Sequence, residues 1–424
     1  MALARALYSL AMVGVQPLLL RKLRRRGQAE PGYLQAAGER FGRYEGATEP
    51  GRLWIHAVSL GETRAAAILI EALRRREPGL RLLLTHGTAT GRAEGERLLR
   101  PGDAQAWLPW DTPQAVRRFL DHFRPRAGVL METEVWPNLT AACARRGVPL
   151  ALANARLSEK SLRQARRLAP LSRTAYASLA AVWAQTEDDA WRLREVGARV
   201  SGVLGNLKFD ADPDPAQLAQ GRAWRARVGR PVLLFASSRE GEELALLQAL
   251  QAVPAAEAAA VQWLLVPRHP QRFDEVADLA ARWGWSVSRR SQWPAEGPPA
   301  PGGLWLGDSL GEMALYYGLA DVALLGGSFE PLGGQNLIEA AACGCPVVMG
   351  PHTFNFAEAA GTAQACGAAL RVADLGEAVK QALALAGDPV RRTQVVEAAS
   401  DFAGAQRGVA VRLAEAVLAL AARA

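Results

Sequence analysis

The sequence is poor in the residues that build disulfide or zinc scaffolds. Its 424 residues include four cysteines and five scattered histidines, and no two cysteines have CxxC spacing. A disulfide framework or a structural zinc site would need such pairing. We therefore predict reduced, buried thiols in a cytoplasmic protein. The residues concerned are Cys143, Cys343, Cys345 and Cys366.

Signatures of the commonest nucleotide-binding and nucleic-acid-binding proteins are also missing. The sequence lacks GxxxxGK[ST], which excludes P-loop chemistry. No GxGxxG follows an early strand with the expected acidic partner, which disfavours a dinucleotide-dependent oxidoreductase. No nucleic-acid-binding module is recognisable, although the formal net charge is +8. The basic balance instead indicates a solvated Arg-rich surface, an anionic membrane or an acidic substrate.

Long apolar runs are absent except for a short one near the N-terminus. Residues 6–20 are almost wholly apolar, contain Pro17 and precede the basic run 21–26. The run is shorter than the ~20 residues that cross a bilayer, and a signal peptide would carry its charge before the apolar part. We predict that residues 1–30 form a membrane-anchor helix with a basic exit, attracted by an anionic membrane surface. A buried first helix is the alternative, and spanning or flat insertion stays open.

Apolar segments typical of buried strands alternate with helical segments along the rest of the chain. In the first half the strand segments are 52–58, 80–85, 125–131, 149–154 and 181–185. After the polar, Pro-rich linker that begins at 211, they are 231–236, 262–267, 304–306, 321–325 and 346–349. Such alternation predicts two α/β domains, each a parallel sheet covered on both faces. Ligands of such sheets bind at the carboxyl ends of the strands.

Polar side chains collect at these strand ends in the first half. The residues that follow the strands are Ser59, Glu62, Glu132, Glu134, Asn154, Arg156 and Ser158. Glu62 at a strand-to-helix turn is the predicted general base, although a first-turn acid can also simply face the helix dipole. Glu132 is a second acid, and a nearby like charge raises the pKa of one partner. Paired acids also suggest a glycoside hydrolase, which the second half disfavours.

Glycine-rich turns before helices mark the second half. Gly307–Met313 and Gly326–Glu339 each contain a loop that opens a helix, where backbone amides approach a phosphate closely. Glu339 lies three residues beyond Asn336, where it can accept both hydroxyls of a ribose. Ordinary turn glycines are the alternative. Weaker candidates lie in these loops and at two other strand ends: Arg239, His269, Ser309, Gly327, Ser328 and Gln335. His269 is equally a packing histidine, and Arg268 beside it suits phosphate.

The series of motifs as a whole resembles the 3-deoxy-D-manno-octulosonic acid (Kdo) transferases among the GT-B glycosyltransferases. After the apolar start, the resemblance rests on GERFG at 38–42, HAVSLGE at 56–62, ETEVWPN at 132–138, NARLSEKS at 154–161, GNLKFD at 205–210, PRHP at 267–270, GDSLGEM at 307–313, GGSF at 326–329 and GGQNLIE at 333–339. It covers nearly the whole chain in the same order.

This resemblance implies a fold and a reaction. The fold is GT-B, with two facing Rossmann-like domains and the active site between them. Residues 31–210 would bind the acceptor and 211–400 the CMP-sugar, and 401–424 would form a helix that crosses back. The reaction transfers Kdo, with inversion, from CMP-Kdo to a lipid A precursor (lipid IVA) in lipopolysaccharide biosynthesis, on the cytoplasmic face of the inner membrane. Neither a metal nor another cofactor is expected.

The resemblance also implies residue roles. Glu62 matches the general base, and Glu132 and Lys208 match positions that support the transition state. The positions that match CMP-contacting segments are Pro267, Arg268, Gly311, Glu312, Met313, Asn336, Leu337, Ile338 and Glu339. Two rival classes remain: a sugar-nucleotide epimerase, which shares the two-domain fold but has little use for an apolar start, and a non-catalytic membrane-associated binding protein.

Overall fold

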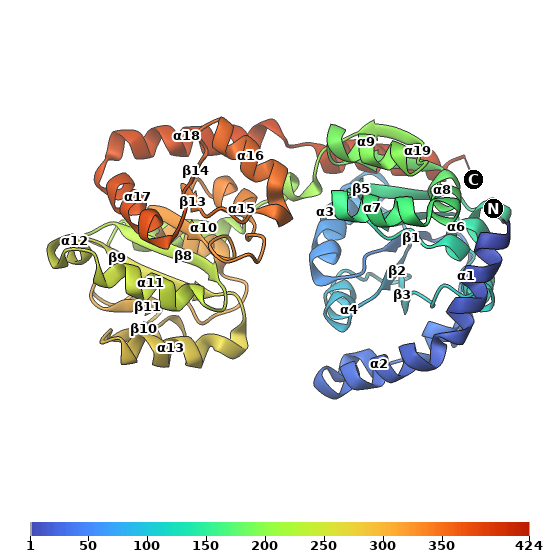
Figure 1. Ribbon diagram of the computed structural model, residues 1–424, viewed down its shortest axis with the longest axis horizontal. Helices are drawn as coiled ribbons and strands as arrows, with labels where there is room; N and C mark the ends of the chain where they lie inside the picture. The colour runs from blue at the N-terminus through green and yellow to red at the C-terminus, as the bar shows by residue number, and fades with distance from the viewer. Residues whose placement is uncertain (1, 424) are drawn as a thin grey trace. The chain divides into compact units, whose positions relative to one another are not determined.

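A computed structural model describes residues 2–423 of the chain, which form two compact units (Figure 1). The first unit comprises the chain up to Asp210 together with the segment from Gly408 onward. The second unit is Ala211–Arg407. Each unit is a seven-stranded sheet with helices on both faces, so the predicted pair of parallel α/β domains is confirmed.

The sheet of the first unit has the order β3-β2-β1-β4-β5-β6-β7, and its paired strands are parallel. Its strands are β1 Leu53–His56, β2 Leu82–His86, β3 Ala104–Trp107, β4 Ala127–Met131, β5 Leu150–Ala155, β6 Ala181–Ala184 and β7 Val200–Val203. The helices after these strands are α3 Leu60–Arg76, α4 Ala89–Glu96, α5 Pro113–Phe123, α6 Pro137–Arg145, α7 Glu159–Arg167, α8 Ala169–Ala177 and α9 Glu187–Glu195. Short 3-10 helices are η1 Pro31–Leu34, η2 Ala37–Phe41 and η3 Leu207–Asp210.

The inner strands are apolar on both faces because each face packs against a separate core. Leu53 and Ile55 of β1 join the core under α3, whereas Trp54 between them joins the core on the opposite face. The alternation follows from the two-residue period of a strand. It explains why these strands appear in the sequence as continuous hydrophobic runs.

The second unit repeats the plan with the order β10-β11-β9-β8-β12-β13-β14. Its strands are β8 Val232–Ser238, β9 Gln262–Pro267, β10 Val287–Arg289, β11 Leu304–Leu306, β12 Val322–Leu325, β13 Val347–Met349 and β14 Ala369–Arg371. Its helices are α10 Pro215–Arg225, α11 Glu242–Gln251, α12 Ala255–Ala259, α13 Phe273–Arg282, α14 Met313–Leu319, α15 Leu337–Ala342, α16 Ala357–Ala365, α17 Leu375–Gly387 and α18 Pro389–Ala405. Short 3-10 helices are η4 Pro270–Arg272, η5 Arg290–Gln292 and η6 Phe354–Phe356. Of the four cysteines predicted to be buried, Cys366 is exposed instead, at the end of α16.

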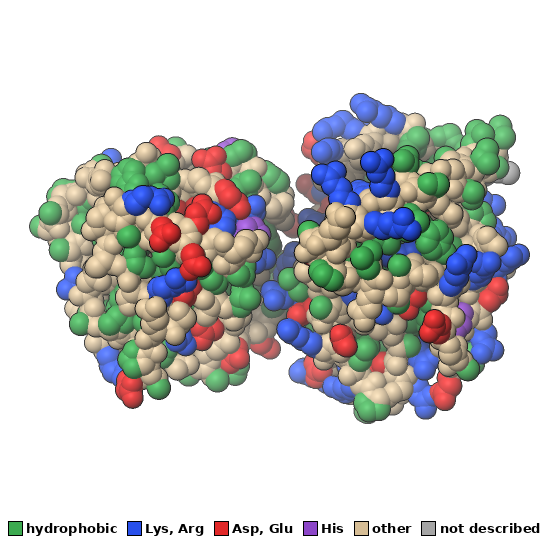
Figure 2. Space-filling model, turned by 90° about the horizontal axis from the view of Figure 1, so that it is seen from below, with side chains coloured by type: hydrophobic (Ala, Val, Ile, Leu, Met, Phe, Trp, Pro, Cys, Tyr) green, Lys and Arg blue, Asp and Glu red, His purple; other side chains and the backbone are tan. Residues whose placement is uncertain are grey.

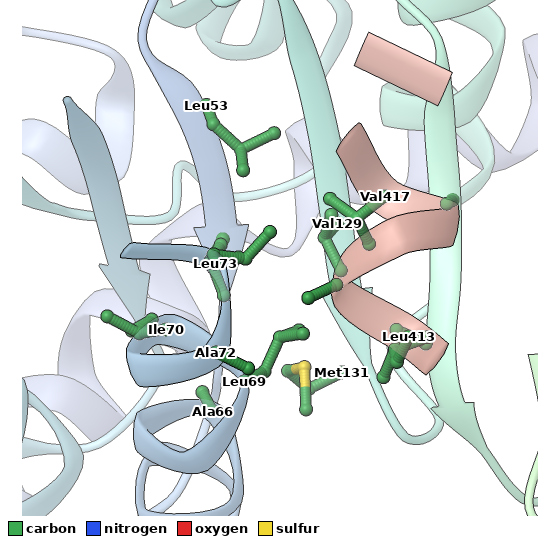
Figure 3. Packing of buried hydrophobic residues seen from close by; sticks show 14 of the residues in the cluster. Leu53, Ala66, Leu69, Ile70, Ala72, Leu73, Val129, Met131, Leu413 and Val417 are labelled. Atoms are coloured by element: carbon green, nitrogen blue, oxygen red, sulfur yellow. The ribbon is translucent and has the colours of Figure 1, made fainter. Parts of the chain in front are cut away.

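The last helix, α19 Val409–Ala421, returns to the first unit. The Asp210 carboxylate accepts hydrogen bonds from the backbone amides of Gly408, at 2.6 Å, and of Ala410. Leu413 and Val417 of α19 pack against α3 and β4 in the buried core (Figure 3). The predicted domain boundary between 400 and 401 lies inside α18, so the division at 407 and 408 corrects it.

The N-terminal segment forms two helices rather than one. α1 Ala2–Gly14 and α2 Gln16–Ala29 meet at a bend of 48°, with Pro17 in the first turn of α2 where proline is tolerated. The basic run 21–26 lies inside α2 and is not an exit segment. Within residues 2–423 no single helix is long and apolar enough to cross a membrane, although the bent pair together meets that criterion.

Helix α1 packs on the first unit by one side only. The Ser9 hydroxyl donates to Oδ1 of Asn138 at the start of α6, at 2.9 Å. On its other side, exposed leucines and a valine recur at helical spacing, with exposed fractions of 51–72% (Leu3, Leu7, Leu10 and Val13). We call these four residues the α1 stripe. Their exposure excludes the alternative of a buried first helix. Figure 2 shows Lys and Arg side chains gathered on the α2 side of the first unit, with hydrophobic side chains beside them.

The packing of α19 gives a first prediction. Leu413→Ala removes a side chain that is 1% exposed, so the free energy of unfolding should fall by about 2–5 kcal/mol. Val411→Ala on the same helix removes a side chain that is 47% exposed and should change it by less than about 0.5 kcal/mol. Urea unfolding of both variants measures the difference. Equal losses would show that α19 is not part of the core.

Candidate active site

Both sheets have a topological switch point at which neighbouring strands send the chain in opposite directions. In the first sheet, β2 and β3 lie on one side of β1 and β4 lies on the other. In the second sheet, β9 and β12 flank β8 in the same way. The carboxyl ends of such strand pairs frame a crevice where ligands of doubly wound sheets bind. Among the predicted site residues, Glu62 and Glu132 follow β1 and β4 in the first unit, and Arg239 and Gly327 follow β8 and β12 in the second.

Glu62 occupies the first turn of α3, directly after the β1 switch strand. One carboxylate oxygen accepts a hydrogen bond from the Val58 amide at 2.9 Å, and the other accepts from the Ser59 hydroxyl at 3.0 Å. Ser59 in turn caps the helix by accepting from the Glu62 amide. Burial raises the pKa of Glu62 to about 7, against these two hydrogen bonds and with the help of Glu132 and Glu134. The carboxylate that is hydrogen-bonded to the capping Ser59 is therefore also the predicted base, and its pKa lies near neutrality.

The loop that presents the Val58 amide is held from behind. The Val58 carbonyl accepts hydrogen bonds from the amides of Gly87 and Thr88 and from the Thr88 hydroxyl, at 2.9–3.1 Å. Buried Arg40 donates to the Gly87 carbonyl at 2.9 Å. A Cβ on Gly91 would lie 2.9 Å from the Val58 carbonyl oxygen, so this close approach requires glycine. The direction of the Val58 amide is thus fixed independently of Glu62.

Glu132 directly follows β4 and has a backbone conformation that non-glycine residues rarely adopt. Its φ is +58°, the residue is 4% exposed, and Arg156 donates to its carboxylate at 2.8 Å. Asn154, the penultimate residue of β5, and Ser237, the penultimate residue of β8, also have positive φ, +50° and +57°. Such strain costs roughly 1–3 kcal/mol per residue and persists at sites that the surrounding structure over-determines. Of the five non-glycine residues with positive φ in the described part of the chain, these three lie at the carboxyl ends of strands, where the site is predicted, whereas Ala36 and Arg124 lie elsewhere.

Lys208 belongs to the same cluster. Burial lowers its pKa, while the charges of Glu132 and Glu62 raise it and that of Arg156 lowers it. Asn154 holds this segment by accepting from the Leu207 amide at 3.0 Å. The structure therefore brings Ser59, Glu62, Glu132, Arg156 and Lys208 together in the first unit. The arrangement offers one carboxylate able to take a proton at neutral pH, beside a second acid neutralised by cations.

Cations gather at the ends of β8 and β9 in the second unit. Burial lowers the pKa of His269, and the neighbouring Arg239, Arg268 and Arg272 lower it further. Pro267 is the buried last residue of β9, whereas Arg268 is exposed. A Cβ on Gly327 would lie 3.2 Å from Nε2 of the Gln335 side chain and 3.6 Å from Cγ of Arg239. The side chains of Gln335 and Arg239 therefore both lie next to Gly327. Such a group of cations suits a phosphate-bearing ligand.

The Gly307–Met313 turn is pinned by side chains that the sequence did not single out. Asp308 accepts from Arg289 at 2.7 Å and from the Ser291 amide at 2.8 Å. Glu312 accepts from Arg290 at 2.8 Å and from the Ser309 hydroxyl. Both predicted polar side chains of this turn, Ser309 and Glu312, are therefore engaged within the loop. Gly311 has φ +79° and open space where a Cβ would stand, and its carbonyl accepts a hydrogen bond from the Gln217 side chain at 2.9 Å.

The loop from Gly326 to Gly334 differs from the predicted phosphate cradle. Fully buried Glu242 accepts hydrogen bonds from the amides of Gly327 at 2.7 Å, Phe329 at 3.1 Å and Arg239 at 2.8 Å. Ser328 is also fully buried, with its hydroxyl bonded to the Leu325 carbonyl and the Gly350 amide. A carboxylate of the chain itself thus occupies the amides expected to meet a phosphate. Only a conspicuous run of acids after β8 could have indicated Glu242 from the sequence.

The last predicted segment opens α15. Asn336 is the cap residue, and its side chain accepts from the Ile338 amide at 3.2 Å. Leu337 and Ile338 are 1% exposed, so they offer only backbone groups to a ligand. Glu339 is partly exposed. Burial is the main cause that raises the pKa of Tyr317 and of Cys343, and the charge of Glu339 raises both further. Between residues 2 and 423, no three His, Cys, Asp or Glu side chains group as metal ligands would.

Comparisons with known proteins agree with these motifs. A family profile described as "3-Deoxy-D-manno-octulosonic-acid transferase (kdotransferase)" matches residues 35–211. A 3-deoxy-D-manno-octulosonic acid transferase of Bordetella pertussis is 50% identical over 428 residues, covering 98% of this chain and 99% of that relative. A protein of the same name from Haemophilus influenzae is 34% identical over 360 residues, 84% of each chain.

Solved structures share the architecture at low sequence identity. A UDP-GlcNAc 2-epimerase from Neisseria meningitidis, bound to UDP-GlcNAc, matches with a TM-score of 0.58 and 14% identity over 87% of this chain and 99% of that chain. A glycosyltransferase from Rickettsia africae ESF-5 matches with a TM-score of 0.57 and 14% identity, with the same coverage. These likenesses establish the fold alone, which is GT-B as predicted.

The contacts of Glu242 give a second prediction. Glu242→Ala leaves the Gly327 and Phe329 amides without their acceptor, so amide hydrogen exchange of 326–334 should accelerate by roughly 5- to 100-fold, equivalent to about 1–3 kcal/mol. Glu257→Ala in α12 alters an exposed acid of the same unit and should leave the exchange unchanged. Peptides from β9 report any general loosening. Unchanged protection of 326–334 in Glu242→Ala would refute the assigned role.

Proposed function

The chain belongs to the Kdo transferase family, and from this premise we propose that it transfers Kdo from CMP-Kdo to a hydroxyl of a lipid A precursor of the lipid IVA type. The observation that carries the catalytic part of the proposal is the Glu62 carboxylate, with its pKa of about 7 at the β1 switch point. A general base works best when its pKa lies near the operating pH.

The reaction is a direct displacement. The Glu62 carboxylate takes the proton of the acceptor hydroxyl while the hydroxyl oxygen forms a bond to the anomeric carbon of Kdo. The bond from that carbon to the phosphate oxygen breaks, and CMP leaves with the electron pair, which inverts the anomeric centre. One positioned base and a stabilised leaving group suffice for such a step. No metal ion or other cofactor is needed.

Glu132, Arg156 and Lys208 support the same step from the side of the first unit. The anomeric carbon develops positive charge as the leaving group departs, and the Glu132 carboxylate is suited to that charge. The Arg156 contact at 2.8 Å and the nearby Lys208 side chain place positive charge beside the buried Glu132 carboxylate. They also balance the anionic carboxylate of Kdo.

The second unit is proposed to hold CMP. Arg268 and Arg239 place positive charge at the ends of β8 and β9, where the leaving phosphate gains most from it, and His269 lies beside them. The backbone of the Gly311–Met313 turn and that of the Asn336–Glu339 turn complete the nucleotide contacts. Glu339 then accepts from the ribose hydroxyls.

An amphiphilic acceptor fits the surface around α2. A pocket of about 160 Å³ lies between α2 and the loops after β2 and β3, with Leu19, Leu23, Tyr33 and Trp110 as apolar lining and Lys22, Arg26, Arg40 and Gly87 completing it. Gly87 donates to the Val58 carbonyl, so this pocket adjoins the loop that carries the base. Apolar walls with cations suit a phosphorylated lipid.

Membrane contact through the α1 stripe completes the proposal. A short helix with one apolar face and a following basic segment lies in the interface, with its charges at anionic headgroups. We propose that α1 lies flat on the cytoplasmic face of the inner membrane, because the bend at Val15 and the docking of Ser9 on α6 oppose a straight crossing.

The function is tested by incubating the purified full-length chain with lipid IVA and CMP-Kdo generated in situ, followed by mass analysis of the lipid. A mass gain of one or more Kdo units supports the proposal and gives their number, and a chelator should leave the gain unchanged. A lipid of unchanged mass would overturn the proposal.

Replacement of the base gives a third prediction. Glu62→Gln should reduce transfer by at least about 100-fold, since general-base catalysis contributes roughly 10²–10⁴-fold. CMP binding should persist. In the wild type the rate should rise with pH and reach half its maximum near pH 7, because protonation below the pKa of Glu62 removes the base. Glu71→Gln, an exposed acid on the same helix, should behave as wild type. Near-normal turnover of Glu62→Gln would exclude it as the base.

The α1 stripe gives a fourth prediction. Leu7→Ser with Leu10→Ser should lower binding to lipid vesicles by roughly 10²- to 10⁴-fold, since each inserted leucine contributes about 1.5–3 kcal/mol. Transfer to detergent-dispersed acceptor should be retained. Val390→Ser with Val411→Ser removes two exposed valines elsewhere and should leave vesicle binding intact. Equal binding by both double variants would contradict insertion of α1.

A further inference from the structure

A groove between α5 and α6 of the first unit gathers arginine side chains. It has a volume of about 470 Å³. Gln114 and Arg117 line it from α5, and Asn138, Arg145 and Arg146 line it from α6. Asn138, Ala142 and Arg145 follow one another at intervals of four and three residues, so they lie on one face of α6, and Arg146 directly follows that helix. No acidic side chain is among the lining residues.

The positive charge of this groove is largely uncompensated. Arg146 pairs with Asp121 at 2.7 Å and also donates to the Arg117 carbonyl at 3.2 Å. Arg117 and Arg145 are exposed, and neither forms an ion pair or a side-chain hydrogen bond with any residue in the described part of the chain. Two guanidinium groups from different helices thus face the groove with their donors available. Planar guanidinium donors recognise phosphate by paired hydrogen bonds.

One end of the groove lies against the helix that carries the α1 stripe. Asn138, a lining residue, accepts the hydrogen bond of Ser9, and Tyr8 is hydrogen-bonded to Asp111, which caps α6. Figure 1 shows α1 beside α6. Leu7 and Leu10 of the stripe flank Tyr8 and Ser9 in the sequence. The groove and the stripe are therefore separated by about one helix diameter, roughly 10 Å.

We propose that this groove binds the phosphate of an anionic lipid headgroup in the membrane on which α1 lies. The proposal rests on the proposed membrane contact of α1. A helix inserted roughly 5–10 Å into the boundary between headgroups and acyl chains places a site one helix diameter away at the level of the lipid phosphates. The site supplies the second signal that stable peripheral anchoring requires besides one apolar helix. It also fixes the rotation of the first unit about α1.

Sedimentation with vesicles tests the proposal on the full-length chain. The vesicles contain phosphatidylcholine alone or mixed with phosphatidylglycerol. Arg117→Gln with Arg145→Gln should lower binding to the mixed vesicles by roughly 30-fold, from about 1 kcal/mol for each arginine near an anionic surface. Binding to pure phosphatidylcholine should not change. Arg194→Gln with Arg199→Gln removes two exposed arginines on α9 and the turn after it, and should leave both unchanged.

Two further arms separate a headgroup site from other sources of binding. Arg117→Lys with Arg145→Lys keeps the positive charge but removes the paired guanidinium donors, so this variant should bind mixed vesicles several-fold more weakly than the wild type. Binding equal to that of the wild type would mean that diffuse surface charge is sufficient, and it would overturn the proposal. Inorganic phosphate at millimolar concentration should not displace the protein from mixed vesicles. Displacement would indicate a site for soluble anions and also overturn it. Transfer to detergent-dispersed lipid IVA is measured separately, and the groove variants should retain it, so loss of transfer and loss of headgroup binding are distinguishable.

Discussion

A carboxylate in the first turn of a helix, accepting amides of the loop before it, organises both units. Glu62 does this after β1, where it receives the Val58 amide, and Glu242 does it after β8, where it receives the Arg239 amide. Both acids satisfy amides that a helix start leaves without partners. Their surroundings separate their roles. Glu242 is fully buried and also receives the Gly327 amide, which makes it a structural tie between two loops. Glu62 remains partly open, so the same contact leaves it able to exchange a proton.

The basicity of Glu62 results from opposed effects. Burial and the charges of Glu132 and Glu134 favour the protonated acid, whereas the Val58 and Ser59 hydrogen bonds favour the carboxylate. Since the pKa of about 7 exceeds the ordinary 4.5, the folded state is stabilised by the protonated form at low pH and loses that contribution as pH rises through 7. The ionised form of Glu62 therefore lowers the stability of the folded state relative to the protonated form. The positive φ of Glu132, next to the neighbouring strand β4, is a second destabilising feature of the site and is conformational rather than electrostatic.

The sequence predicted the centre of each sheet better than its edges. The ten inner strands coincide with the predicted apolar runs, because strands buried on both faces are continuously hydrophobic. The four edge strands, β3, β7, β10 and β14, were missed, since partly exposed strands such as VSGV and VSR lack that signal. Similarly, the positions of Glu62 and Glu132 after β1 and β4 follow from the strand pattern. The occupation of the Gly327 amide by Glu242 does not, because it joins residues far apart in the sequence.

The structure separates the basic residues by role, which the composition alone does not. Some arginines are structural: Arg40 is buried among backbone carbonyls, and Arg272 is paired with buried Glu243. Others, such as Arg156, neutralise a functional acid. The basic run of α2 and, in the α5–α6 groove, Arg117 and Arg145 have neither task, and both groups lie on the unit that carries the exposed leucines of α1. A charge excess spread evenly for solubility would not follow the apolar surface in this way. Basic residues that lie beside exposed apolar side chains are attracted to a membrane, in which anionic headgroups cover an apolar interior.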